Sequence, residues 1–114
     1  MALSRGRLTD NVINVSDGST VGILTVADNK KIYVKSMLAH NTSGVTTATA
    51  SIYYVPNGDS VGTNTRVFEV SVDPEESIFI EPSYPIVLTN TGDGMSAKAT
   101  SAQINFLFTG DKEV

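Results

Sequence analysis

The chain of 114 residues contains no cysteine, no tryptophan and a single histidine, His40. Without cysteine it can form no disulfide bond, no thiolate zinc site, no iron–sulfur cluster and no cysteine nucleophile. The base of a Ser-His-Asp triad would have to be His40, which falls at the end of a predicted strand beside Asn41. The composition therefore argues against most hydrolases, oxidoreductases and metalloenzymes, and we expect neither a cofactor nor an enzymatic activity.

Three further kinds of functional site are absent or incomplete in the sequence. No glycine precedes Lys-Ser or Lys-Thr, so there is no Walker-type phosphate loop. The run Asn90–Gly94 resembles part of a calcium loop but lacks the alternating acids and the closing glutamate, and is predicted to be a turn. A glycosidase needs only two carboxylates, but the candidate acids fall on a turn and a strand rim, where solvated acids are expected. These acids are Glu69, Glu75, Glu76 and Glu81.

The chain also lacks long apolar runs and an overall basic charge. No run approaches the roughly 18 apolar residues of a membrane-spanning helix, and no apolar stretch of a secretory signal follows Arg5 and Arg7. The net charge is −4, so the sequence predicts binding neither to membranes nor to nucleic acid. The charge is nevertheless split, with five basic and three acidic residues in positions 1–35 and three basic and nine acidic residues after them. Such a split can steer head-to-tail or subunit-to-shell contacts, and the alternative is a solvated surface that serves no partner.

Alternation of apolar and polar residues with a period of two recurs along the chain, whereas a sustained helical period does not. Four longer runs predict strands at 31–40, 47–55, 65–72 and 104–109. The last two each have an apolar face, made of Phe68, Val70 and Val72 in one and of Ile104, Phe106 and Phe108 in the other, and the aromatic face is expected in the core. Five shorter runs predict strands at 12–15, 21–26, 77–80, 86–88 and 95–99. In the first run, strict alternation predicts one face made of Ile32, Val34, Ser36 and Leu38. It predicts an opposite face made of Tyr33, Lys35, Met37 and Ala39.

Turn-forming residues separate these runs at intervals of roughly 8 to 14 residues. Examples are Asp17-Gly18, Asn57-Gly58 and Gly92-Asp93-Gly94. A parallel crossover would need about a dozen intervening residues, usually helical, and no helix longer than one turn is predicted. Eight or nine short strands in one small domain predict an all-β antiparallel β-sandwich, with jelly-roll and immunoglobulin-like topologies both open.

Residues 20–114 are expected to form this single β-sandwich domain, and residues 1–19 an N-terminal arm or first strand. An arm would reach a neighbouring subunit, which makes Arg5, Arg7 and Leu8 candidate interface residues. Tyr53 and Tyr84 are the aromatic candidates for an interface or a sugar-stacking platform, with packing in the core as the alternative. No residue is predicted to be catalytic or to bind a metal or cofactor.

Several segments resemble the small structural proteins of tailed bacteriophage virions. The resemblance covers roughly residues 20–110 and transfers no catalytic residue. It rests on the segments Lys31–Ser36, His40–Gly44, Ala50–Gly58, Thr65–Phe68, Pro82–Leu88, Gly92–Ala97 and Phe106–Gly110.

This resemblance implies a β-sandwich that coats a capsid or decorates a neck or tail, located in the virion and assembled in the host cytoplasm. The first hypothesis is a capsid decoration (cement) protein that binds the major capsid protein or other virion proteins as a homo-oligomer. A trimer is favoured because it suits a three-fold site on a shell. One alternative is a neck, collar or tail-associated protein. Another, of a different class, is a carbohydrate-binding module for host attachment in which Tyr53 or Tyr84 stacks on sugars.

Overall fold

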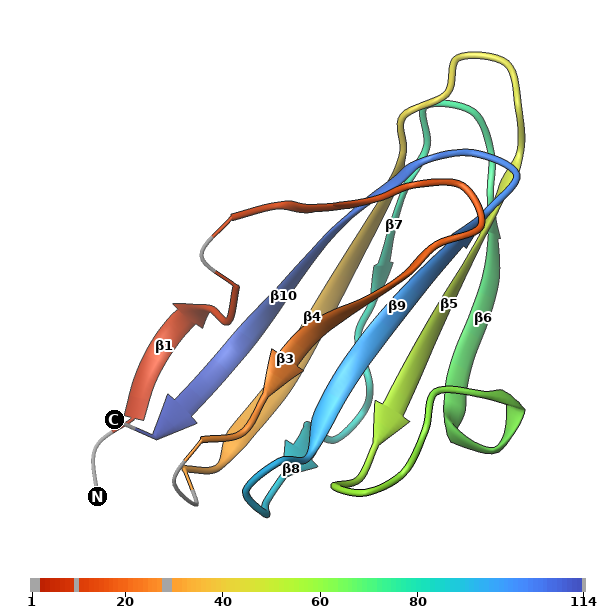
Figure 1. Ribbon diagram of the computed structural model, residues 1–114. Helices are drawn as coiled ribbons and strands as arrows, with labels where there is room; N and C mark the ends of the chain where they lie inside the picture. Colours follow the sequence, from red (N-terminus) through yellow and green to blue (C-terminus); the bar gives the residue numbers. More distant parts are fainter. Residues whose placement is uncertain (1–2, 10, 28–29, 114) are drawn as a thin grey trace.

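The computed structural model describes residues 3–9, 11–27 and 30–113. Within this part of the chain, ten strands form two antiparallel sheets that pack face to face as a sandwich (Figure 1). The predicted all-β sandwich is therefore confirmed. The one helical element in the same residues is a single 3₁₀ turn, η1 (Thr63–Thr65), and none of their helices is long and apolar enough to cross a membrane.

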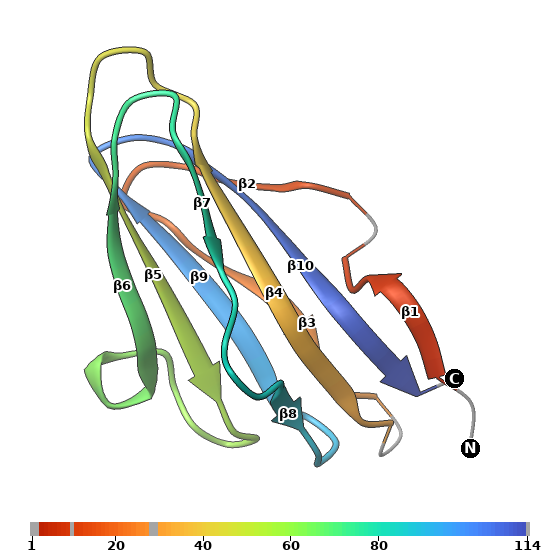
Figure 2. The ribbon, with the colours of Figure 1, turned by 180° about the vertical axis from the view of Figure 1, so that it is seen from behind.

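The six-stranded sheet is built around two long central strands, β4 (Ile32–Asn41) and β10 (Ile104–Glu113), which pair with each other. The far side of β10 is shared by β1 (Leu3–Arg7) and β2 (Ile13–Val15). The far side of β4 is shared by β7 (Ser77–Ile80) and β8 (Ile86–Leu88), as seen from behind in Figure 2. Each edge of this sheet thus consists of two short strands instead of one long one.

The four-stranded sheet has the order β3-β9-β5-β6. Its strands are β3 (Thr20–Thr25), β9 (Gly94–Thr100), β5 (Ala48–Val55) and β6 (Arg66–Val72). From β2 to β5 the chain crosses from one sheet to the other at every step, so neighbours in sequence face each other across the sandwich. This wrapping is that of a jelly roll, whereas an immunoglobulin-like fold would keep its first two strands in one sheet. Of the two topologies that the sequence left open, the structure therefore has the jelly roll.

The positions of nine predicted strands agree with the structure, and their bounds differ by a few residues. The strand that was not predicted is β1, which lies in the segment expected to be an arm or first strand and pairs with the end of β10. The last strand is also longer than predicted, because β10 continues from Thr109 to Glu113. Leu3 pairs with Glu113, so the two ends of the described chain lie side by side.

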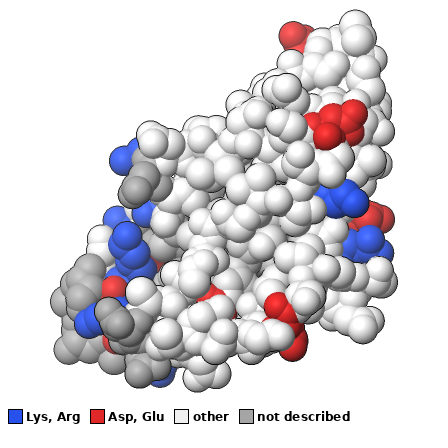
Figure 3. Space-filling model, in the orientation of Figure 1, with Lys and Arg blue, Asp and Glu red and all other residues white. Residues whose placement is uncertain are grey.

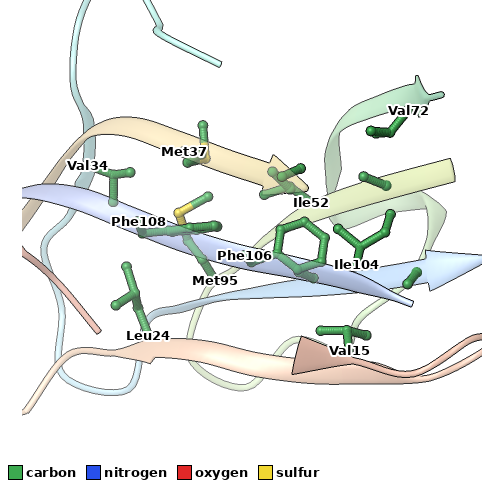
Figure 4. Close-up of a cluster of buried hydrophobic side chains, with 14 of the residues drawn as sticks. Val15, Leu24, Val34, Met37, Ile52, Val72, Met95, Ile104, Phe106 and Phe108 are labelled. Atoms are coloured by element: carbon green, nitrogen blue, oxygen red, sulfur yellow. The ribbon is translucent and has the colours of Figure 1, made fainter. Parts of the chain in front are cut away.

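The core lies between the sheets and is filled from the faces that alternation predicts in β10 and β6 (Figure 4). Ile104, Phe106 and Phe108 are fully buried, and Val72 of β6 is buried opposite them. Phe106 and Phe108 are the largest side chains in this layer. Truncating such a ring to alanine costs about 3 to 5 kcal/mol, so these residues contribute much of the stability that holds the sheets together.

The alternation predicted for residues 31–40 is wrong beyond Val34, because β4 contains a bulge. Thr109 pairs with Ser36 and Gly110 pairs with Val34, which leaves Lys35 without a partner in the ladder. One extra residue in a strand moves every later side chain to the opposite face. Ile32 and Val34 therefore face the core as predicted, but beyond the bulge the buried residues are Met37 and Ala39 in place of Ser36 and Leu38.

Candidate interaction surfaces

Three large apolar side chains lie in one row across the outer face of the six-stranded sheet. Leu107 of β10 pairs with Leu38 of β4, and Leu38 pairs with Phe79 of β7. Paired residues of antiparallel strands point to the same face, so the three side chains are neighbours. Leu38 and Leu107 are half-buried and Phe79 is 65% exposed. We call Leu38, Phe79 and Leu107 the apolar row; it lies on the side of the molecule seen in Figure 2.

A polar row runs beside the apolar row on the same face. Asn14 Nδ2 donates a hydrogen bond of 2.8 Å to Asn105 Oδ1, and His40 Nδ1 lies 2.8 Å from Ser77 Oγ. Asn105 pairs with His40 and His40 pairs with Ser77, so these contacts join four adjacent strands: β2, β10, β4 and β7. The single histidine thus lies at a strand end, as the sequence predicts, and its contact with Ser77 ties β4 to β7.

A basic corner surrounds the end of β10, and Figure 3 shows its blue side chains at the lower left. It contains six of the eight lysine and arginine residues: Arg5, Arg7, Lys30, Lys31, Lys35 and Lys112. Asp111 lies among them, with Lys35 Nζ 2.7 Å from its Oδ2 and Arg5 Nε 3.5 Å from its Oδ1. The hydrogen bond and charge of Lys35, reinforced by Arg5, hold the pKa of the Asp111 carboxyl below its usual value. The basic residues therefore keep Asp111 ionised and outnumber it.

A hollow of about 320 Å³ opens beside the basic corner, between the two sheets. Its apolar lining comes from Leu8, which follows β1, from Ile23 and Leu24 of β3, and from Ile32 of β4. It is also lined by Thr25, Ala27, Lys30, Lys112 and Glu113. Hollows of this volume are at the lower end of the range that holds small ligands. The lining thus combines apolar side chains with two lysines and one acid, a net positive charge that suits an apolar group carried next to negative charge.

A tip projects from the opposite end of the sandwich, where the β4–β5 turn (residues 42–47) lies against the β6–β7 turn (residues 73–76), at the top of Figure 1. The Glu75 amide donates a hydrogen bond of 2.9 Å to the Ser43 carbonyl, which joins the two turns. Val45, at 89% exposure, is the most exposed large apolar residue in the described chain.

The buried amide of Asn41 holds the tip in place from below. Its Nδ2 donates hydrogen bonds to the carbonyls of Thr46 at 2.8 Å and Val72 at 3.0 Å. Its Oδ1 accepts one of 2.9 Å from the Ser43 amide. The Ser43 hydroxyl in turn accepts bonds from the amides of Val45 and Thr46. Because the polar groups of this turn have partners within the protein, the tip presents Val45 on a fixed backbone.

The structure separates the five candidate interface residues. Arg5 and Arg7 are exposed on β1, and Leu8, which follows them in the chain, lines the hollow beside the basic corner. Leu8 packs against the core, and its amide donates a hydrogen bond of 2.9 Å to the Phe108 carbonyl. Tyr84 is 84% exposed between β7 and β8. Tyr53 is only 5% exposed on β5, so of the two alternatives for this residue the structure shows burial and not a surface position.

The apolar row and Val45 were not identified from the sequence. The row depends on the register of three strands that are distant in the chain, and register is not visible in the alternation of one strand. For Val45 a signal exists, since it is a valine between Gly44 and Thr46 in a segment of turn-forming residues. No group of three or more potential metal ligands occurs in residues 3–9, 11–27 and 30–113.

Neither known protein-family models nor curated proteins match the sequence of this chain. Solved structures do match its fold. A subunit of the Bacillus endospore appendages, which are disulfide-linked pili, is 15% identical with a TM-score of 0.54, and the match covers 98% of this chain and 88% of that one. A chain of the T13 viral particle of IBDV is 9% identical with a TM-score of 0.53. A chain of the Nora virus structure is also 9% identical, with a TM-score of 0.50.

The chain spans 31% of the IBDV chain and 60% of the Nora virus chain, while 98% and 97% of its own residues are covered. It therefore matches one jelly-roll unit within each larger viral chain. The fold is shared with viral particle proteins and with an appendage pilin, and these likenesses concern the fold alone.

Proposed function

We propose that this chain is a non-enzymatic structural protein of a virion, which binds the outer shell as a decoration protein. Its partner would be the major capsid protein or another virion protein. The observation that carries the proposal is the apolar row of Leu38, Phe79 and Leu107 on the outer face of the six-stranded sheet. The sequence resemblance to structural proteins of bacteriophage virions and the jelly-roll fold support it.

The apolar row is suited to docking because of where it lies. Two of its members belong to the central strands β4 and β10, which are hydrogen-bonded on both sides and therefore form a rigid platform. The polar row beside it offers amide, imidazole and hydroxyl groups that can bond a partner at the rim of a contact. One small patch gives modest affinity, and many copies bound together on a shell give a stable coat.

Copy number in purified particles tests this proposal. We expect the chain in hundreds of copies per particle, since a shell repeats one site over its whole surface. About 6 to 18 copies would assign it to the neck, collar or tail, whose symmetry is that of a ring. Absence from the particles would overturn the proposal. The favoured trimer is tested by the mass of the purified protein in solution, which would be three times 12.1 kDa.

A second candidate, the subunit of an extracellular appendage, is favoured by the size of the chain. The chain covers 88% of the Bacillus appendage subunit but smaller shares of the viral chains. An appendage of this protein would differ from the disulfide-linked pili, because the chain has no cysteine to form disulfide bonds between subunits. Fibres visible by electron microscopy on cells that make the chain, labelled by an antibody against it, would favour this candidate over the virion.

The carbohydrate-binding alternative retains one of its two aromatic platforms. Tyr53 is buried on the four-stranded sheet, whereas Tyr84 is exposed beside the six-stranded sheet. A glycan array separates this alternative from the structural role: a signal that Tyr84→Ala abolishes would support it, and an array without signal would exclude it.

A further inference from the structure

The two ends of this elongated molecule differ in charge: the tip end is acidic, and the opposite end gathers most of the lysines and arginines together with several acids. The molecule measures 46 × 27 × 24 Å, and β4 runs from the hollow at Ile32 to the base of the tip at Asn41, a distance of about 30 Å. The described turns at the tip end, residues 14–19, 41–48, 72–77 and 100–104, contain four acids and neither lysine nor arginine: Asp17, Asp73, Glu75 and Glu76. The opposite end carries the basic corner. Figure 3 shows red atoms at the upper end and the blue cluster at the lower left.

The tip carries its charge next to an exposed apolar group. Val45 projects from the β4–β5 turn, and the β6–β7 turn bonded to it carries Asp73 and Glu75. Glu75 has φ 60, in the left-handed region that glycine adopts without strain. The Glu75 amide, bonded to the Ser43 carbonyl, holds the backbone at this position.

The hollow beside the basic corner has the complementary chemistry. Leu8, Ile23 and Ile32 offer an apolar lining, and the charged residues of the lining are two lysines, Lys30 and Lys112, and one acid, Glu113, so positive charge is in excess there. An acidic tip ending in an apolar side chain fits such a site, since the apolar group leaves water while each carboxylate approaches an ammonium group.

We infer that the tip of one copy docks into the hollow of the next copy, with Val45 against Leu8, Ile23 and Ile32 and the tip acids near Lys30 and Lys112. The contact joins two different surfaces of the same molecule, so it is heterologous and produces a ring if it closes and a chain if it does not. The inference does not rest on the proposed function: the effect of tip and hollow variants on association tests the inference, and presence in particles tests the proposed function.

Sedimentation velocity of the purified protein, in low salt and at concentrations up to about 1 mM, tests the contact directly. We expect species that grow in steps of 12.1 kDa as concentration rises and that shrink when salt screens the charges. Val45→Arg should leave only the monomer. The matched control is Val61→Arg, which alters an exposed valine in the β5–β6 connection and should associate like the wild type.

Charge reversal provides the sharper test. Asp73→Lys with Glu75→Lys reverses the tip, and Lys30→Glu with Lys112→Glu reverses the hollow. Each double variant should be monomeric alone, because its two ends now repel. An equimolar mixture should associate again, since the reversed tip fits the reversed hollow and the native tip fits the native hollow. Circular dichroism and thermal melting establish that each variant is folded.

Three results would overturn the inference: a wild type that remains monomeric throughout, association that both reversals leave unchanged, or a mixture that stays monomeric. A fourth distinguishes another occupant of the hollow. This result has three parts: the monomer binds the fluorescent probe 8-anilinonaphthalene sulfonate, Lys112→Glu abolishes that binding, and Val45→Arg leaves the mass of the sedimenting species unchanged. Together they would show that the hollow is a small-ligand site and not a docking site for the tip.

Discussion

The carboxylate of Asp93 accepts a hydrogen bond of 3.0 Å from the backbone amide of Asn57, which joins two turns that are 36 residues apart. Its second oxygen accepts one of 3.1 Å from the amide of Asn90. The side chain is nearly inaccessible to water, yet the bonds from Asn57 and Asn90 lower the pKa of Asp93 below its usual value. The sequence run that resembles a calcium loop is therefore a turn whose acid is used within the protein.

The Asp93 contacts predict a loss of stability in acid. Because the pKa of Asp93 is lower in the folded than in the unfolded state, its ionised form stabilises the fold above the unfolded pKa, about 3.9. That contribution is lost as the pH falls through the folded pKa. Asp93→Asn should reduce the free energy of unfolding at pH 7 by about 1 to 3 kcal/mol and flatten its decline in acid. Urea unfolding between pH 7 and pH 2 measures both effects, with the exposed Asp59→Asn as control.

Gly110 is predicted to be the least replaceable glycine. A Cβ at this position would overlap the carbonyl oxygen of Tyr33 at the bulge between β4 and β10. Gly110→Ala should therefore cost at least about 3 kcal/mol, because the neighbouring atom is backbone and cannot rotate away. Gly22→Ala is the control, since a Cβ there meets nothing within 4 Å. Thermal melting of the two variants compares them, and equal melting temperatures would contradict the assigned register.

The same bulge shows what alternation in a sequence can and cannot predict. Ile104, Phe106 and Phe108 were correctly placed in the core, because β10 keeps a period of two over that stretch. Residues 36–39 were assigned to the wrong faces, since the extra residue in β4 lies opposite Gly110, about 75 positions later in the chain. One strand read by itself contains no trace of such a constraint.

Alternation did not reveal three other features, for related reasons. Strand β1 (Leu3–Arg7) is exposed along its whole length, so it pairs with β10 through backbone bonds and shows no apolar face. Tyr53 alternates like an outward residue of β5 and is nevertheless buried. The apolar row depends on two registers at once, β10 with β4 and β4 with β7. The fold class follows from local patterns, whereas the candidate surfaces follow from pairings between distant segments.

Asn41 is predicted to control the stability of the tip. Its side chain makes three hydrogen bonds to backbone groups that Asn41→Ala would leave without partners. We expect a loss of about 3 kcal/mol in the free energy of unfolding, and faster hydrogen exchange at the Ser43 amide than at amides of β10. Asn14→Ala, which removes one exposed side-chain bond, should cost less than about 1 kcal/mol. A uniform increase in exchange would show that Asn41 supports the whole fold and not the tip.

Phe79→Ser is predicted to abolish docking to the shell without unfolding the protein. Phe79 is largely exposed, so replacing its ring removes little core packing and should change the free energy of unfolding by less than about 1 kcal/mol. In a contact, burying that ring is worth about 1.5 to 3 kcal/mol per copy, a loss that repeats over every bound copy. Cosedimentation with particles assembled without this chain measures the effect.

The control for that experiment is Val67→Ser, on β6 of the other sheet, where an apolar side chain of comparable exposure lies away from the apolar row. Normal docking of Val67→Ser together with loss for Phe79→Ser would identify the six-stranded sheet as the attachment face. If only Val67→Ser lost docking, the attachment face would be the four-stranded sheet. If both variants still docked, neither sheet would be the attachment face, and the tip and the hollow would remain as contact surfaces. Val45→Arg in the same assay would then decide whether copies attach to the shell through the ends of the molecule.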